Sequence, residues 1–204
     1  KAIVIACNTA SALALDAVKD EFDLPIIGVV IPGARAAVEA TTNGKVGVVG
    51  TEATVQSGMY TKVIQGMNPK IEVIEKACPL FVPLVEEGFK EHIVTREIIE
   101  YYLESMRNTD IDAMILGCTH YPLLRSKIRE YMGDKIQIVN PAYETAMDLK
   151  CLLEENDMAN DGTEGQHSNY SFYVSDAAEK FRKFANTVMP FDVPITNVVN
   201  IEGY

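Results

Sequence analysis

Two cysteines, Cys7 and Cys118, stand in matching sequence contexts and are the residues best suited to chemistry in this chain. Each follows an apolar run, 3–6 or 113–117, and each precedes side chains with hydroxyl or amide groups. Such runs predict buried strands, and open α/β sheets bind ligands at the carboxyl ends of their strands. A thiolate at such a strand end is stabilised by the following helix N-terminus and its backbone N–H groups. Each cysteine alone also fits a small, buried core residue.

His120, two residues after Cys118, is a second candidate for proton transfer. A neutral imidazole accepts a thiol proton, and an imidazolium holds a thiolate or a carboxylate; the alternative is a half-exposed histidine at a helix start. A zinc site would need two further ligands at recognisable spacing, which the sequence lacks, so we predict no metal. Asn8, Thr9 and Thr119 either cap helices or hydrogen-bond a ligand.

The alternation of apolar and amphipathic stretches that positions these residues predicts an α/β protein with parallel sheets. A break at 31–33 and the Asn140 and Pro141 pair indicate crossings between two similar parallel-sheet α/β domains that face each other across a cleft. We expect residues 1–30 plus 140–204 to form the first, incomplete domain, and residues 31–139 to form the second. The polar run 154–168 is expected to be a surface loop.

The expected elements follow from apolar periodicity and capping residues. Asn8 or Thr9, Thr51 and Thr95 are the expected helix caps. Strands are expected at 2–6, 25–30, 46–50, 71–74, 113–117, 136–139 and 170–174. Helices are expected from the first cap to residue 22, at 34–42, after Thr51, within 79–88, and at 95–106, 122–132, 142–154 and 177–188.

Composition restricts the class of protein. The 204 residues are 48% hydrophobic, which suits a globular chain with a full core. The net charge of −11 argues against a nucleic-acid binder. No apolar run reaches the roughly 18 residues that span a bilayer, and no signal peptide is visible. Four cysteines without a CxxC pair favour reduced thiols in the cytoplasm, with Cys78 and Cys151 in structural roles.

Three motifs carry a family resemblance: A-C-N-T-A-S, C-P-L-F-V-P-L-V-E-E-G and L-G-C-T-H-Y-P-L-L. In this order and spacing, the sequence resembles bacterial glutamate racemase of the aspartate/glutamate racemase superfamily. The resemblance implies a cofactor-independent enzyme that interconverts L- and D-glutamate and supplies the D-isomer for peptidoglycan. It also implies a small-molecule substrate, and we expect a homodimer that binds neither nucleic acid nor membrane.

The resemblance assigns roles to the candidate residues. Cys7 would serve the D-glutamate face, and Cys118 with His120 would serve the L-glutamate face, one thiol removing a proton while the other delivers one. Glu86 matches the acidic residue that the family places near the catalytic histidine, although adjacent acids such as Glu86 and Glu87 are usually a solvated helix face. Asn8, Thr9, Thr119 and His120 would bind the substrate's carboxylates and ammonium group.

Two alternatives remain open. An aspartate racemase of the same superfamily uses the same pair of thiols but usually has Glu in place of His120. The resembled family also carries βα units, with Asp-Ser and Pro-Tyr-Gly motifs, before the point where this sequence starts. We find neither motif, so we expect a form that lacks this N-terminal segment, and an inactive binding protein is the second alternative.

Overall fold

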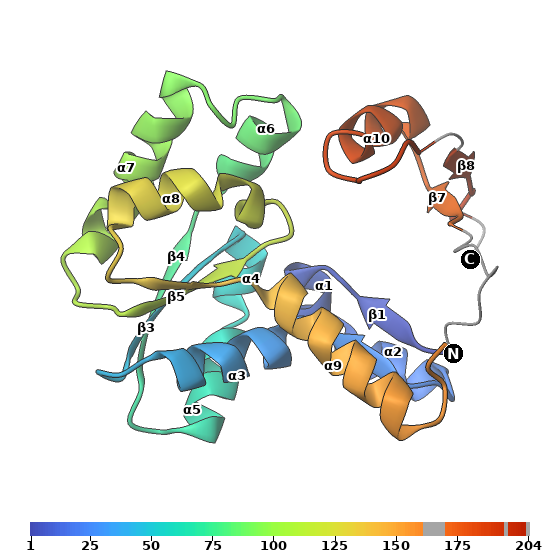
Figure 1. The fold of residues 1–204 in the computed structure, drawn as a ribbon, viewed down its shortest axis with the longest axis horizontal. Coiled ribbons are helices and arrows are strands. Elements are labelled where there is room, and N and C mark those ends of the chain that lie inside the picture. The colour runs from blue at the N-terminus through green and yellow to red at the C-terminus, as the bar shows by residue number, and fades with distance from the viewer. Residues whose placement is uncertain (161–169, 194–195, 203–204) are drawn as a thin grey trace. The chain divides into compact units, whose positions relative to one another are not determined.

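The computed structural model describes residues 1–160, 170–193 and 196–202. The chain divides into two compact units, Lys1–Ala159 and Asn160–Tyr204, and each is described by itself (Figure 1). The predicted division into residues 1–30 plus 140–204 and residues 31–139 stays a prediction.

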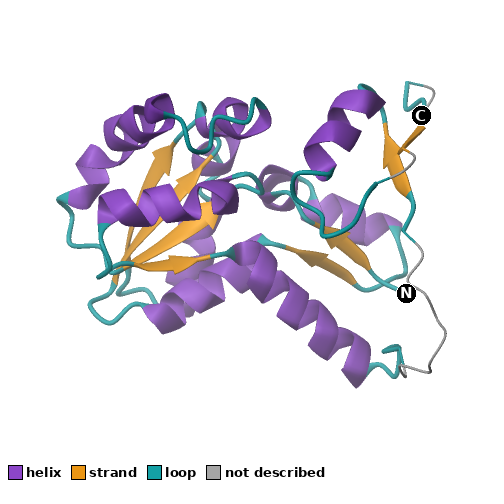
Figure 2. Cartoon of the chain, turned by 45° about the horizontal axis from the view of Figure 1, so that its top comes forward, coloured by secondary structure: helices purple, strands orange, loops and turns teal. Residues whose placement is uncertain are grey.

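A four-stranded parallel sheet forms the centre of the first unit (Figure 2). Its strand order is β4-β3-β5-β6, so the order reverses between β3 and β5. Gly50 and Gly117, the last residues of β3 and β5, are paired across this switch point, where open α/β sheets bind ligands. The strands are β3 (Lys45–Gly50), β4 (Glu72–Ala77), β5 (Ala113–Gly117) and β6 (Gln137–Val139).

Helices cover both faces of this sheet (Figures 1 and 2). Strand residues alternate between the faces. Val46 and Val48 share a buried cluster with residues of α3 (Val30–Ala40) and α5 (Met59–Met67). On the other face, a Cβ at Gly47 would lie 2.8 Å from Met106 of α7, so glycine allows that helix to approach closely. This second face is covered by α7 (Ile93–Arg107) and α8 (Arg125–Met132).

Three short elements follow the carboxyl ends of the strands. They are α4 (Glu52–Gln56) after β3, α6 (Phe81–Glu86) after β4, and the 3-10 helix η1 (Tyr121–Leu124) after β5. Thr51 is the N-cap of α4, as predicted, and its side chain accepts a hydrogen bond from the Thr54 N–H. These three elements therefore place their first residues at the same edge of the sheet.

A second, two-stranded parallel sheet carries the N-terminal segment. Ser11 ties its two strands together, because the Ser11 hydroxyl donates to the Ile5 carbonyl at 2.8 Å and accepts the Val29 N–H at 3.1 Å. The strands are β1 (Ile3–Ile5) and β2 (Ile26–Gly28), accompanied by α1 (Asn8–Leu13), α2 (Leu15–Glu21) and α9 (Pro141–Glu155).

The second unit is small. Its parallel strands β7 (Phe172–Val174) and β8 (Thr196–Val198) accompany α10 (Ala178–Ala185). The rings of Tyr170 and Phe191 stack with centroids 4.6 Å apart. Most of the loop predicted at 154–168 lies outside the described residues.

The predicted break at 31–33 is wrong, because α3 runs through it from Val30. Pro32 lies in the first helical turn, where the backbone N–H that proline lacks would have no intrahelical partner. Gly33 allows Pro141 of α9 to approach, since a Cβ on Gly33 would lie 2.9 Å from the proline ring. The Pro-Gly pair therefore serves helix packing rather than a turn.

Two predicted caps and one helix also need correction. The N-cap of α1 is Cys7, not Asn8 or Thr9, and the helix expected to run to residue 22 is divided at Ala14. The N-cap of α7 is His92, whose Nδ1 accepts the Val94 N–H at 3.2 Å. Thr95 lies inside α7 and donates its hydroxyl to the Phe89 carbonyl.

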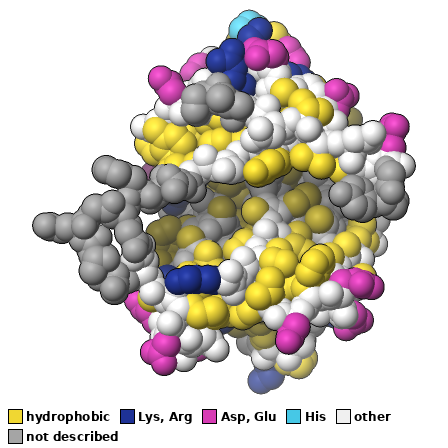
Figure 3. Space-filling model, turned by 90° about the vertical axis from the view of Figure 1, so that its right-hand side faces the viewer, with side chains coloured by type: hydrophobic (Ala, Val, Ile, Leu, Met, Phe, Trp, Pro, Cys, Tyr) yellow, Lys and Arg dark blue, Asp and Glu magenta, His cyan; other side chains and the backbone are white. Residues whose placement is uncertain are grey.

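Some large apolar side chains of the first unit are exposed. Leu13, Phe22 and Tyr101 are examples, with 64%, 51% and 73% of their surface exposed. Figure 3 shows hydrophobic side chains, in yellow, on one face of the molecule. No helix among the described residues combines the length and the apolar character needed to cross a bilayer.

Candidate active site

A cluster of threonine hydroxyls joins the segments that follow β1 and β3. The Thr9 Oγ1 lies 2.9 Å from that of Thr51 and 3.0 Å from that of Thr54, and the last two are 3.0 Å apart. These contacts bring the residues that follow Cys7 against the switch point of the central sheet. The site therefore combines segments from both sheets of the first unit.

Cys7 lies at the open side of this arrangement. It is exposed, and its Sγ accepts the Ala10 N–H at 3.5 Å as the cap of α1. Within residues 1–160 this is the one hydrogen bond to the Cys7 sulfur.

Cys118 is buried, with 8% of its surface exposed. Burial raises the pKa of the Cys118 thiol and outweighs hydrogen bonds from the His120 and Tyr121 N–H groups and the Thr119 hydroxyl, which lower it. The helix expected at 122–132 begins as the 3-10 helix η1 and continues as α8, and a turn separates Cys118 from it. The sulfur therefore meets a tight ring of donors rather than a helix N-terminus.

The structure brings the two predicted cysteines together. Cys7 is close enough for its charge to raise the pKa of Cys118. Because two neighbouring negative charges repel, the ionisation of one thiol makes the ionisation of the other less favourable. This favours a state with one thiolate and one thiol. A pair of this kind can accept a proton at one sulfur and donate one from the other.

His120 and Glu86 form a chain that leads away from Cys118. The Glu86 Oε1 is 3.3 Å from the His120 Nε2, and the His120 Nδ1 is 3.9 Å from the Cys118 Sγ. Since a carboxylate only accepts hydrogen bonds, Nε2 carries the hydrogen in a neutral imidazole and Nδ1 is the acceptor. The Thr119 hydroxyl, 3.3 Å away, can donate to the same Nδ1. The geometry lets His120 accept the Cys118 proton while Glu86 stabilises the imidazolium.

Tyr121 holds this chain on the sheet. Its buried hydroxyl donates to the carbonyl oxygens of Gly50, at 3.0 Å, and Cys78, at 2.8 Å. Its ring meets that of Phe81 edge to face, with centroids 5.1 Å apart. Because Phe81 begins α6, these contacts fix the helix that carries Glu86 relative to His120.

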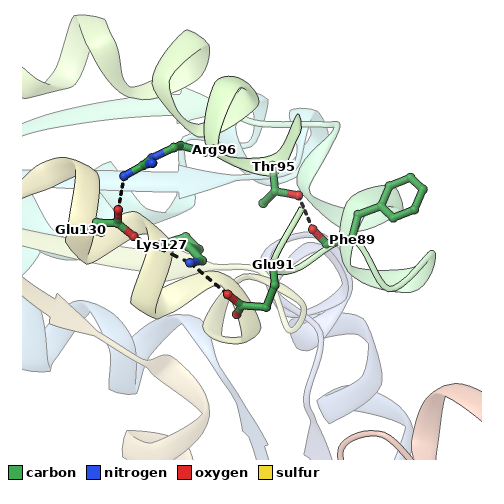
Figure 4. A network of polar contacts seen from close by, with 6 residues as sticks. All are labelled: Phe89, Glu91, Thr95, Arg96, Lys127 and Glu130. Carbon is green, nitrogen blue, oxygen red and sulfur yellow. Dashed lines mark hydrogen bonds and ion pairs between the residues drawn. The ribbon is translucent and has the colours of Figure 1, made fainter. Parts of the chain in front are cut away.

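The loop after α6 is fixed by further polar contacts (Figure 4). The Thr95 hydroxyl donates to the Phe89 carbonyl at 2.6 Å. Lys127 of α8 pairs with Glu91 at 2.9 Å and lies 3.8 Å from Glu130. The loop is thus tied to both helices of that face.

Asn8 is buried beside Cys7, with 4% of its surface exposed. Its Oδ1 accepts the Tyr60 hydroxyl at 2.6 Å, so the amide Nδ2 is the group it could offer to a carboxylate. Thr119 is exposed beside His120. The predicted roles of Asn8, Thr9 and Thr119 in binding substrate stay predictions.

Sequence reasoning missed Thr54 and Tyr60, and it treated Thr51 only as a cap. A signal was available for the threonines, because Thr51 directly follows the glycine that ends an apolar strand, as Cys118 does. Nothing in the sequence marks Tyr60, whose partner Asn8 lies 52 positions away.

The other two cysteines lie apart from this chemistry. Cys78 is buried, and burial raises its pKa to about 12, which suits the structural role expected of it. Cys151 of α9, for which a structural role was also expected, is exposed. Among the described residues, no three His, Cys, Asp or Glu side chains are grouped as metal ligands.

Residues 1–148 match the family described as Asp/Glu/Hydantoin racemase. The glutamate racemase of Geobacter metallireducens is 42% identical over 186 residues, which cover 91% of this chain and 68% of that protein. The chain belongs to the Asp/Glu/Hydantoin racemase family.

Solved structures agree with this family. Glutamate racemase isoform RacE1 of Bacillus anthracis has a TM-score of 0.92 and 34% identity, over 98% of this chain and 74% of that one. Glutamate racemase of Francisella tularensis, solved in complex with D-glutamate, has a TM-score of 0.91 and 34% identity, over 100% and 75%. The predicted racemase-like α/β fold and the kinship with amino-acid racemases are confirmed.

Proposed function

We propose that this protein is a glutamate racemase in which Cys7 and Cys118 exchange protons with the two faces of the substrate Cα. The observation that carries the proposal is the pair of strand-end thiols brought together at the switch point of the sheet. Homologues named glutamate racemase and a related structure bound to D-glutamate support glutamate as the substrate.

The reaction would start with one thiolate and one thiol. From L-glutamate, the Cys118 thiolate removes the Cα proton and becomes a thiol, leaving a carbanion next to the carboxylate. The Cys7 thiol then donates its proton to the opposite face, giving D-glutamate and a Cys7 thiolate. The reverse reaction exchanges the two roles, so no proton is gained or lost by the enzyme and substrate together.

The neighbouring groups would assist each half of the reaction. His120, backed by Glu86, stabilises the Cys118 thiolate as an imidazolium or holds a substrate carboxylate. Hydrogen-bond donors from Asn8, Thr9 and Thr119 bind the carboxylates of glutamate. The thiols and these donors require neither a metal nor an organic cofactor.

The cellular role would be the supply of D-glutamate for peptidoglycan in the cytoplasm. We also propose a homodimer, which sedimentation velocity tests by the mass of the purified protein in solution.

The direct test is to follow the loss of optical rotation of pure L-glutamate and of pure D-glutamate with the purified protein. We expect both to reach the racemic mixture. L-aspartate is the matched control, because the family also includes aspartate racemases. Turnover of aspartate in preference to glutamate would overturn the substrate assignment, and turnover of neither would overturn the proposed activity.

A further inference from the structure

Tyr60 is a fully buried tyrosine that touches the neighbour of Cys7. It lies in the first turn of α5, with 0% of its surface exposed. Its hydroxyl donates to the Asn8 Oδ1 at 2.6 Å, and Asn8 directly follows Cys7. Because Asn8 is itself buried, this hydrogen bond restricts where the Cys7 backbone can lie.

The same side chain also touches the neighbour of Cys118. A Cβ placed on Gly117 would lie 3.2 Å from the Tyr60 Cε2 and 2.8 Å from the Val49 carbonyl oxygen. The tyrosine ring therefore packs directly against the backbone that leads into Cys118. One rigid side chain with two rotatable bonds thus spans the residues next to both cysteines.

We propose that Tyr60 is a positioning residue that sets the separation between the Cys7 and Cys118 sulfurs. The inference rests on the proposed function. Proton transfer to opposite faces of one carbon requires each sulfur at about 3–3.5 Å from it, and hence the two sulfurs at about 6–7 Å from each other. A spacer that contacts both segments would hold this separation before substrate arrives.

The hydroxyl, rather than the ring alone, would transmit the constraint to Cys7. A phenylalanine would fill nearly the same volume and keep the contact with Gly117. It would leave the Asn8 Oδ1 without its donor in a buried position, so the Asn8 side chain would turn to find another. Burial, and after it the charges of Glu75 and Cys118, raise the pKa of Tyr60, so its hydroxyl remains a neutral donor.

The first test compares Tyr60→Phe with Tyr102→Phe in the intact protein. Tyr102 is also buried, and its ring packs edge to face against that of Phe81, a contact that phenylalanine keeps. For Tyr60→Phe we expect kcat to fall about tenfold with KM within about twofold of wild type. The reason is that the Cys7 sulfur would shift from its position for proton transfer, while the groups that bind substrate remain. Tyr102→Phe should keep the wild-type kcat. An unchanged kcat in Tyr60→Phe, or an equal fall in both variants, would overturn the inference.

A double-mutant cycle with Asn8→Ala tests whether Tyr60 acts through Asn8. If it does, adding Tyr60→Phe to Asn8→Ala changes kcat by less than about twofold, since the contact is already broken. Two losses that multiply would contradict the inference. Should Tyr60→Phe not fold, Asn8→Ala breaks the same hydrogen bond from its other end, and a wild-type kcat in that variant would also overturn the inference.

A crystal structure of Tyr60→Phe gives a readout that does not depend on activity. We expect a turned Asn8 amide and a changed separation between the Cys7 and Cys118 sulfurs; an unchanged separation would refute the role of Tyr60. Wild-type protein that fails to racemise glutamate counts against the proposed function, whereas active wild type with an equally active Tyr60→Phe counts against the inference alone.

Discussion

Cys7 and Cys118 differ more in their surroundings than their matching sequences suggest. Cys118 is buried at the end of a strand with a strand on either side, and a chain of His120 and Glu86 extends from it. Cys7 is exposed and follows a strand of a two-stranded sheet. The Cys118 side of the site is therefore fixed by the core of the four-stranded sheet. The position of Cys7 depends instead on the contacts that Asn8 and Thr9 make with residues that follow β3.

The difference also separates the two thiols chemically. Burial favours the neutral form of Cys118, so its ionisation depends on the donors around it. The His120 Nδ1 lies 3.9 Å from the Cys118 sulfur and is the base that we propose on that side. Within residues 1–160 the hydrogen bond to the Cys7 sulfur comes from a backbone N–H alone. Two thiols in unequal environments can still serve the proposed reaction. Each turnover in one direction leaves them in the protonation states from which the opposite direction starts.

The largest expected effect is the loss of either thiol. Cys7→Ala and Cys118→Ala should each lower kcat/KM by at least about 10³-fold, since the group that transfers the proton is removed. The fall must be equal in both directions because L- and D-glutamate have the same free energy. Cys151→Ala, which alters an exposed cysteine of α9, is the matched control and should keep wild-type activity. Near-normal turnover by Cys7→Ala or by Cys118→Ala would contradict the proposal that both thiols transfer protons.

A smaller effect should distinguish the two halves. Glu86→Gln weakens the stabilisation of the His120 imidazolium and should lower kcat/KM about tenfold to 10²-fold. Glu87→Gln, at the neighbouring acid, should change it little. We further expect the deuterium isotope effect on L-[2-²H]glutamate to rise and that on D-[2-²H]glutamate not to, because in the proposed mechanism Cys118 removes the proton of the L-isomer. Equal changes for both isomers would remove the assignment of His120 to one face.

How much of this could be predicted depends on distance along the chain. The strand-end cysteines and their local motifs are visible because apolar runs and the residues after them are local signals. The Thr9, Thr51 and Thr54 cluster and the Tyr60 contact with Asn8 join residues more than 40 positions apart, so they exist only once the sheets are assembled. Pro32 was misread because a proline in a first helical turn and a proline in a loop look alike in sequence.

A stability effect without a catalytic one is expected at the opposite end of β5 from Cys118. Burial alone would raise the pKa of Asp112, but hydrogen bonds from Thr41, Thr42 and Asn43 outweigh it and lower the pKa to about 2. Since the folded pKa lies below the unfolded one, near 3.9, this stabilisation is present above about pH 4 and is lost as the pH falls toward 2.

The variant Asp112→Asn tests this contribution. It should lower the free energy of unfolding at pH 7, because the amide loses the hydrogen bonds to the charged carboxylate. We expect a loss of only about 1 kcal/mol, since solvent screens a half-buried carboxylate. The kcat should not change. Urea unfolding at pH 7 and at pH 3 measures the effect, and the gap between the variant and wild type should narrow at the lower pH. A constant gap would contradict the assigned hydrogen bonds.

The smallest expected effect is that of metal removal. Dialysis against a strong chelator should leave kcat unchanged, and the protein should show no absorbance band of a bound aldimine. Loss of activity that zinc restores would point instead to a metal held by Cys118 and His120.

The central claim is that two thiols act on opposite faces of one carbon, and a solvent-isotope experiment tests it most directly. D-glutamate is converted in ²H₂O, and deuterium at Cα is measured in substrate and product during the first few per cent of reaction. The account predicts that the L-glutamate formed carries deuterium while the remaining D-glutamate carries none, because the proton removed stays on one sulfur and the deuteron comes from the other. Product that retains the original hydrogen, or substrate that gains deuterium as fast as product forms, would contradict it.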